Sequence, residues 1–260
     1  MKRSIYIFIL FFVSQIIVAF VAFAMVNASA LASGGPLMVD VAAYPPVTIG
    51  QATCVAEVLL ILALIAFRLT STRRPLTDAF RRGMPRRWWL ALLAFVVLSF
   101  GIAFVLVPLK LDDFGMQAQF EGMTESWVCI LTLVVVAPVA EELVFRDGIQ
   151  REMMAAGAKP WVAIATSALA FGVVHGDPAQ MVPAALMGGA LGWLYYTTGD
   201  VRLCVPAHII NNAISLGMMQ YPEIDESIAA ASPWLTVIGG ISMCIVAQSM
   251  FVMARKKSNV

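Results

Sequence analysis

Long apolar runs separated by short polar stretches dominate this chain. Eight such runs follow one another along the 260 residues, and most approach or exceed the ~20 apolar residues with which a helix crosses a bilayer. They lie near residues 4–26, 48–67, 88–109, 127–145, 161–176, 180–197, 203–219 and 233–254. The pattern predicts an all-α polytopic membrane protein of about eight transmembrane helices.

The composition agrees with this interpretation. Apolar residues make up 60% of the chain and charged residues 13%, against ~45–50% and about 25% in soluble domains. We expect residues 1–260 to form a single integral membrane domain. Its central core would lie at about 127–219, between N-terminal helices at about 4–109 and a C-terminal helix at about 233–254. The net charge of +1 indicates no nucleic-acid partner.

The basic residues predict the orientation in the membrane, because cytoplasmic loops are rich in Lys and Arg. With eight crossings, every basic cluster falls on one side. The clusters are residues 2–3, 68–87, 146–159, 202 and 255–257. Acidic connections near 110–125 and 221–227 fall on the other side. We therefore expect both termini in the cytoplasm, and the short loops favour a bacterial inner (cell) membrane.

The first apolar run allows two interpretations. Ala30-Leu31-Ala32 fits the small-residue pattern of a signal-peptide cleavage site. The run is longer than the apolar region of an ordinary signal peptide, so we expect a retained anchor helix.

Ionisable residues inside the apolar runs are candidates for function, because burying them in a membrane is unfavourable. They are Glu57, Glu141, Glu142, Arg146, His175 and His208. The protein has only two histidines, and both fall within or at the edge of a predicted span. Glu57 has no evident partner in the sequence, so we expect it to serve packing or to be protonated.

The stretch APVAEELVFRDG at 137–148 places two carboxylates and a guanidinium near the end of a span. Glu142 and Arg146 are four residues apart and are expected to form an ion pair on one helix face. Glu141 is rotated by ~100° from Glu142 and should face another partner. Pro138 frees a backbone carbonyl in the preceding turn and can kink the helix there.

Two further positions are predicted to approach this stretch. Gly157 and Pro160 indicate a turn between two antiparallel helices, which would bring Glu141 and His175 to the same level, each ~24 Å from the turn. Phe171 lies one helical turn before His175. The four-residue spacing of His208 and Asn212 puts both on one face of a later helix, with Asn211 as a competitor for that face.

These residue types suit hydrolysis of a peptide bond. A glutamate and a histidine can share and activate a water molecule, while a histidine N–H and an asparagine N–H can stabilise the oxyanion. No serine or cysteine stands in a motif-like position. Cys204, four residues before His208, is the only rival nucleophile near the histidines.

The combined pattern resembles the three motifs of the CPBP intramembrane proteases, also called the CAAX prenyl endopeptidase or Abi family. The motifs are Glu141-Glu142-x-x-x-Arg146, Phe171-x-x-x-His175 and His208-x-x-x-Asn212. The resemblance implies a glutamate-type peptidase within the membrane that needs no metal or other cofactor. It also implies cleavage near the cytosolic side.

The resemblance assigns a role to each motif position. Glu141 and His175 would activate the water, and His208 and Asn212 would form the oxyanion hole. Supporting roles fall to the remaining motif residues, which are Glu142, Arg146 and Phe171. The expected partners are a peptide or membrane-protein substrate and membrane lipids, whereas the identity and prenylation of the substrate and the oligomeric state are not predicted.

Three alternatives stay open at this point. Glu141, His175 and His208 could ligate zinc in a membrane metalloprotease with one open position, although no HExxH spacing is present. The chain could also be a non-catalytic membrane scaffold or immunity protein. A transporter with a proton relay is the third alternative, although no inverted repeat is visible in the sequence.

Overall fold

The computed structural model describes residues 2–40, 43–71 and 87–255, and the regular secondary structure among them is helical, with no strand. The helices before the core are α1 Lys2–Val26, α2 Ala28–Ser33, α3 Pro46–Ser71, α5 Trp88–Leu106, η2 Val107–Leu109 and α6 Met116–Met123. A continuous helical segment follows, made of α7 Trp127–Leu131, η3 Thr132–Val136, α8 Ala137–Val144, η4 Phe145–Gln150 and α9 Arg151–Ala155. The last helices are α10 Pro160–Val173, α11 Pro178–Thr198, α12 Val201–Met218, α13 Pro222–Ala230 and α14 Pro233–Arg255.

The prediction of an all-α polytopic membrane protein is confirmed. Each of the eight predicted spans coincides with helix. Five helical segments in the described part of the chain are long and apolar enough to cross a membrane, namely Arg3–Val26, Pro46–Ala66, Trp88–Leu109, Trp127–Ala155 and Pro233–Ala254. The count of eight crossings is not confirmed: α10 is shorter, and α11 and α12 are less apolar than the five. Most of the arginine-rich loop at 68–87 lies outside the described residues.

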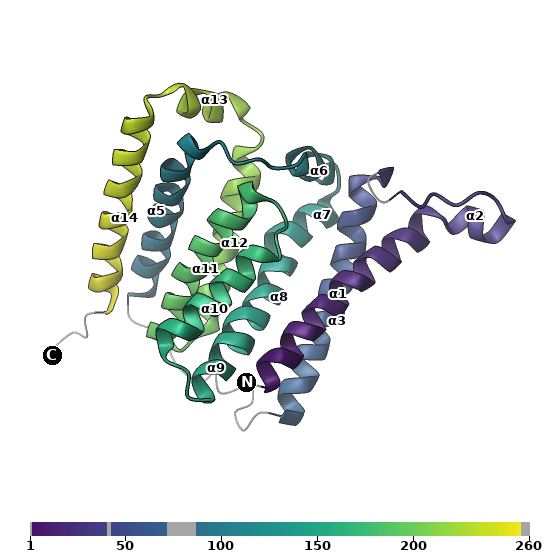
Figure 1. The fold of residues 1–260 in the computed structure, drawn as a ribbon, viewed down its shortest axis with the longest axis horizontal. Coiled ribbons are helices and arrows are strands. Elements are labelled where there is room, and N and C mark those ends of the chain that lie inside the picture. The colour runs from purple at the N-terminus through teal and green to yellow at the C-terminus, as the bar shows by residue number, and fades with distance from the viewer. Residues whose placement is uncertain (1, 41–42, 72–86, 256–260) are drawn as a thin grey trace.

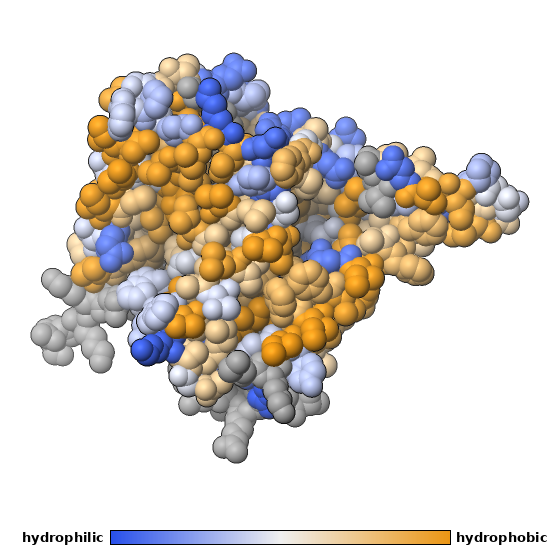
Figure 2. All heavy atoms as spheres, in the orientation of Figure 1, coloured by the Kyte–Doolittle hydropathy of each residue, from blue (hydrophilic) through white to orange (hydrophobic). Residues whose placement is uncertain are grey.

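Three helix pairs form the body of the protein, as Figure 1 shows. Helix α5 packs along α14, α10 along α11, and α1 along α3. Helix α8 lies between these pairs and contacts both α3 and α12. The side of the bundle is apolar, with hydrophilic residues gathered around the end occupied by α6 and α13 (Figure 2). Such a broad exposed apolar surface suits contact with lipid.

The packing of α5 on α14 depends on two glycines. A Cβ atom on Gly240 would lie 2.6 Å from the carbonyl oxygen of Gly101, and a Cβ on Gly101 would lie 2.9 Å from that of Gly240. The two backbones therefore touch directly, as small residues allow between membrane helices.

The two ends of the bundle differ in charge. The start of α1, the turn after α9 and the end of α14 lie at one end, whereas α6 and α13 lie at the other (Figure 1). The first end carries Arg3, Arg151 and Lys159, and the second carries acidic residues of α6 and α13 such as Glu121 and Glu223. The separation of charge predicted along the chain is therefore present in space, and the cytoplasmic placement of the basic end stays a prediction.

Candidate active site

The segment from Trp127 to Ala155 is the central element of the site. Two π-helical stretches, η3 and η4, interrupt it on either side of α8, which carries Glu141 and Glu142. Such wide turns are rare and occur frequently at functional sites. The first of them, η3, ends two residues before Pro138, and the kink expected at this proline stays a prediction.

The first π-helical stretch leaves one carbonyl without a helical partner. The N–H of Ala137 donates to the carbonyl of Thr132, five residues back. The next residue, Pro138, has no N–H to donate to Leu133. The side-chain amide of Asn212 takes this place and donates to the Leu133 carbonyl at 2.9 Å. This hydrogen bond therefore connects α12 to the segment that carries Glu141 and Glu142.

The ion pair predicted between Glu142 and Arg146 is present and fully buried. Arg146 Nη1 lies 3.1 Å from Glu142 Oε1. Arg146 Nη2 donates to the carbonyl of Gly188 on α11 at 3.2 Å, and the guanidinium carbon lies 4.5 Å from the centre of the Phe171 ring. A carboxylate, a carbonyl and an aromatic face thus surround the buried cation, which is otherwise unfavourable away from water.

His208 joins the two adjacent glutamates. Its Nδ1 lies 2.9 Å from Glu142 Oε1, and its Nε2 lies 3.6 Å from Glu141 Oε2. An ionised carboxylate only accepts hydrogen bonds, so Nδ1 carries a proton toward Glu142. The Nε2 of a neutral His208 is then an acceptor, and it donates only when the ring is an imidazolium.

The sequence had suggested that His175 lies on a helix at 161–176. In the structure α10 ends at Val173, and His175 lies in the turn that follows. The turn is possible because Gly176 adopts a φ of 87°. His175 Nδ1 donates to the carbonyl of Phe171 at 2.7 Å, since a carbonyl only accepts. The Nε2 of a neutral His175 is left as an acceptor, and the ring packs edge-on against Phe171 with centroids 4.8 Å apart.

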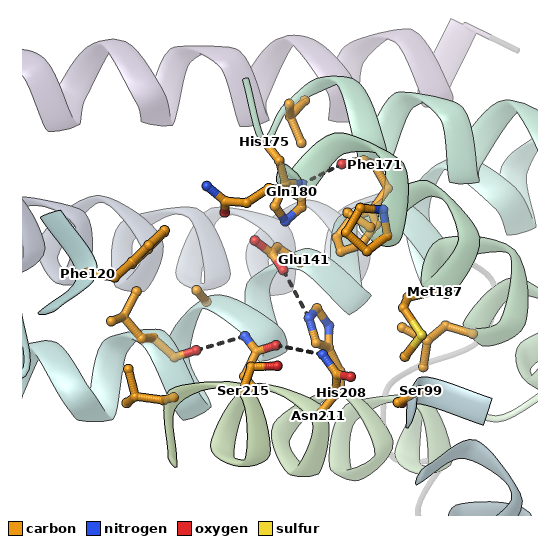
Figure 3. Close-up of a pocket in the computed structure, with 18 of the residues that line it drawn as sticks. Ser99, Phe120, Glu141, Phe171, His175, Gln180, Met187, His208, Asn211 and Ser215 are labelled. Atoms are coloured by element: carbon orange, nitrogen blue, oxygen red, sulfur yellow. Dashed lines mark hydrogen bonds and ion pairs between the residues drawn. The ribbon is translucent and has the colours of Figure 1, made fainter. Parts of the chain in front are cut away.

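One cavity of about 510 Å³ brings the predicted catalytic residues together, because Glu141, His175, His208 and Asn212 all line it. Figure 3 shows the Glu141 carboxyl group between the two imidazoles. The Glu141 side chain is 17% exposed, whereas that of Glu142 is fully buried. Phe171 also lines the cavity, but Glu142 and Arg146 do not. The hairpin prediction that Glu141 and His175 lie at the same level agrees with this arrangement.

Sequence reasoning missed several polar residues of the cavity wall. Gln180 lies on the first turn of α11, and its side-chain amide donates to Asp177, while its backbone N–H bonds to Asp177 Oδ1 at 2.9 Å. The signal was available, since Asp followed by Pro is typical of a helix start. Ser215 of α12 also lines the cavity, beside Asn211, which the sequence had already indicated.

Glu57, for which the sequence offered no evident partner, has one in the structure. Gln15 Nε2 on α1 donates to Glu57 Oε1 at 3.3 Å, and both residues line the cavity. The sequence could not reveal this contact, because 42 residues separate the two partners along the chain.

Two observations bear on the alternative chemistries. Within the described ranges, no three side chains of His, Cys, Asp or Glu are grouped so that they could hold a metal ion. Cys204 is buried in the apolar cluster beside Leu191 and is not among the described residues that line the cavity.

Comparison with protein families identifies the segment that carries this site. Residues 123–214 match the type II CAAX prenyl endopeptidase Rce1-like family. The protein has a CAAX protease family core. The core begins at the end of α6, includes all three motifs and ends within α12, so it contains Glu141, His175, His208 and Asn212. No curated protein and no solved structure matches the chain.

The family places the chain among membrane endopeptidases, which are hydrolases that act on peptides or proteins in the membrane. The CAAX protease core accounts for about a third of the chain. Helices α1, α3 and α5 lie outside it, yet Gln15, Glu57 and Ser99 from these helices complete the cavity wall.

Proposed function

We propose that this CAAX protease family protein is an intramembrane endopeptidase of the glutamate type, with no metal in the reaction. The observation that carries the proposal is the position of the Glu141 carboxyl group, which lies between two imidazoles inside a cavity (Figure 3). A partly exposed carboxylate in such a place can take a proton from water.

In the proposed reaction, Glu141 and His175 hold the attacking water. The water donates one hydrogen bond to the Glu141 carboxylate and another to the Nε2 lone pair of His175, whose Nδ1 is engaged by Phe171. The water oxygen attacks the carbonyl carbon of the substrate, and its proton passes to Glu141. The same proton then moves to the amide nitrogen, so that the C–N bond breaks and releases an amine and a carboxylic acid, whose proton passes to the amine.

The oxyanion of the tetrahedral intermediate would be stabilised from α12. Asn212 uses one amide N–H for Leu133, and its second N–H is available to the oxyanion. His208 would donate from Nε2 as an imidazolium, with Glu142 at its other nitrogen. Preorganised donors of this kind lower the barrier because they do not reorient during the reaction.

The proposed substrate is a peptide or a membrane-protein segment. The cavity walls on α5 and α11 carry apolar side chains such as Phe95, Ile102 and Leu191, which suits a membrane-derived chain. Prenylated CAAX sequences are the substrates that the matched family's description names, and apolar walls also suit a prenyl group. Following the charge distribution, we propose a bacterial inner membrane with both termini toward the cytosol. The expectation of cleavage near the cytosolic side does not fit this orientation, because the cavity reaches Phe120 of α6 and Met219 after α12, at the end of the bundle away from the termini.

The experiment compares membrane proteomes of cells that carry wild-type protein, Glu141→Gln or the control Glu125→Gln. Glu141→Gln changes one oxygen to nitrogen and removes the base, whereas Glu125 is exposed and lies outside the cavity. Uncut precursors should accumulate with Glu141→Gln alone. Identical proteomes for wild type and Glu141→Gln, at equal protein levels, would refute the proposal.

A further inference from the structure

Glu57 on α3 is a buried carboxylate that the proposed reaction does not use. Its residue is 3% exposed. Oε1 accepts a hydrogen bond from Gln15 on α1, whereas Oε2 is buried without any hydrogen-bond partner among the described residues. Both Glu57 and Gln15 line the cavity that contains Glu141. An acceptor that is buried, unsatisfied and placed on a cavity wall points to a donor from outside the chain.

The charges around the cavity favour a cation as that donor. The described residues of the wall include two carboxylates, Glu57 and Glu141, and two imidazoles, but no Lys or Arg. The nearby guanidinium of Arg146 lies behind the wall, engaged by Glu142, Gly188 and Phe171. When Glu57 is ionised, a neutral donor would satisfy its free oxygen but would leave the negative charge without compensation in a site of low polarity.

Gln15 supplies a second acceptor at the same place. Its amide nitrogen donates to Glu57 at 3.3 Å and to the hydroxyl of Ser14 at 3.4 Å. These bonds use only the nitrogen, so the amide oxygen can accept from a ligand. A carboxylate oxygen and an amide oxygen from two helices match the several N–H donors of an ammonium or guanidinium group.

We propose that Glu57 and Gln15 form a specificity subsite that binds a Lys or Arg side chain of the substrate. The inference rests on the proposed endopeptidase function. The basic side chain would extend toward α1 and α3, while apolar substrate groups would contact the opposite wall of α5 and α11, where Phe95 and Ile102 lie. Glu141 lines the same cavity. A basic side chain bound at Glu57 and Gln15 would therefore occupy one fixed position relative to the bond that is cut.

The experiment measures cleavage by the purified full-length protein in liposomes. The probe is a library of apolar peptides in which each position carries Arg, Lys, Gln, norleucine or Glu, and mass spectrometry reports every cleaved bond. Wild type should cut peptides with Arg or Lys at one position about tenfold faster than the Gln equivalents, because the matched charge removes an unpaired buried group. Glu57→Gln should abolish that ratio, Glu57→Lys should favour Glu there, and Glu125→Gln should behave as wild type.

Several results would overturn the subsite. A wild-type protein that cuts peptides without preferring a basic residue would exclude it, whether or not the variants fold. A folded Glu57→Gln protein that keeps the full preference would exclude it as well. Failure of the proposed function looks different, since wild type would then cut no peptide or Glu141→Gln would cut as fast as wild type, and the subsite would fall with it.

Discussion

Replacing Arg146 by Met would leave the Glu142 carboxylate buried without its cation. Methionine fills a similar length but loses the ion pair at 3.1 Å, the hydrogen bond to Gly188 and the contact with the face of Phe171. Both members of the pair are fully buried. Removing one partner of such a pair destabilises a protein by about 3–5 kcal/mol.

The expected loss can be measured by thermal unfolding in detergent, followed by tryptophan fluorescence. For a chain of this size 1 kcal/mol corresponds to about 2–4 °C in Tm, so Arg146→Met should lower Tm by roughly 6–20 °C. The double variant Glu142→Gln, Arg146→Met removes both charges and keeps an oxygen for His208 Nδ1. It should recover about half of the loss or more, because no buried charge is left unpaired.

Two results would refute this reasoning. The first is a single variant whose Tm lies within about 2 °C of wild type, which corresponds to 1 kcal/mol or less. The second is a double variant that is less stable than Arg146→Met alone, since the unpaired carboxylate would then not be the cause of the loss.

Four further outcomes are expected. Asn212→Ala should lower kcat by about 100-fold, with a smaller change in KM, because one oxyanion donor is lost; an unchanged kcat contradicts that role. Gly188→Ala should destabilise by about 1–3 kcal/mol, since the new Cβ would lie 3.1 Å from the Phe171 ring, whereas the control Gly189→Ala meets nothing within 4 Å and should leave Tm unchanged. Activity should survive exhaustive chelation, and loss that zinc restores would favour the metalloprotease. Hydrogen bonds from the N–H groups of Gln117 and Gly115 lower the pKa of Asp113. The stability that the ionised Asp113 contributes is therefore present above the ordinary pKa of aspartate and is lost as the pH falls through the lowered pKa. The Tm difference between wild type and Asp113→Asn should shrink in that acidic range.

The sequence predicted the parts of the site that depend on local spacing. The pair Glu142 and Arg146 follows from their separation by one helical turn, and the hairpin before Pro160 follows from the turn signals around Gly157. The prediction that Glu141 and His175 lie at the same level then requires only the rise per residue of an α-helix. The resemblance to a known family supplied the roles, which the geometry alone does not test.

Contacts between distant segments could not be predicted in the same way. The hydrogen bond between His208 and Glu142 spans 66 residues, and that between Asn212 and Leu133 spans 79. Both depend on how α12 packs against α8. The subsite at Glu57 depends on the packing of α1 against α3, and neither arrangement leaves a periodic signal in the sequence.

The number of crossings was also beyond what apolar runs alone can decide. Helices α11 and α12 lie around a polar cavity, and they carry residues such as Asn211, Asn212 and His208 that lower their apolar character. A run that lines such a cavity is less apolar than one that faces lipid, so composition separates these helices less clearly from the surrounding loops.

Pro138 has an influence that reaches beyond its own helix. Any other residue at that position would bring a backbone N–H within reach of the Leu133 carbonyl, and this N–H would compete with the Asn212 side chain for that acceptor. Pro138→Ala should therefore weaken this hydrogen bond and allow the Asn212 side chain to rotate, which would change turnover although the altered atom does not contact the substrate. The absence of a backbone N–H at Pro138 thus helps to fix the orientation of the Asn212 side chain on another helix.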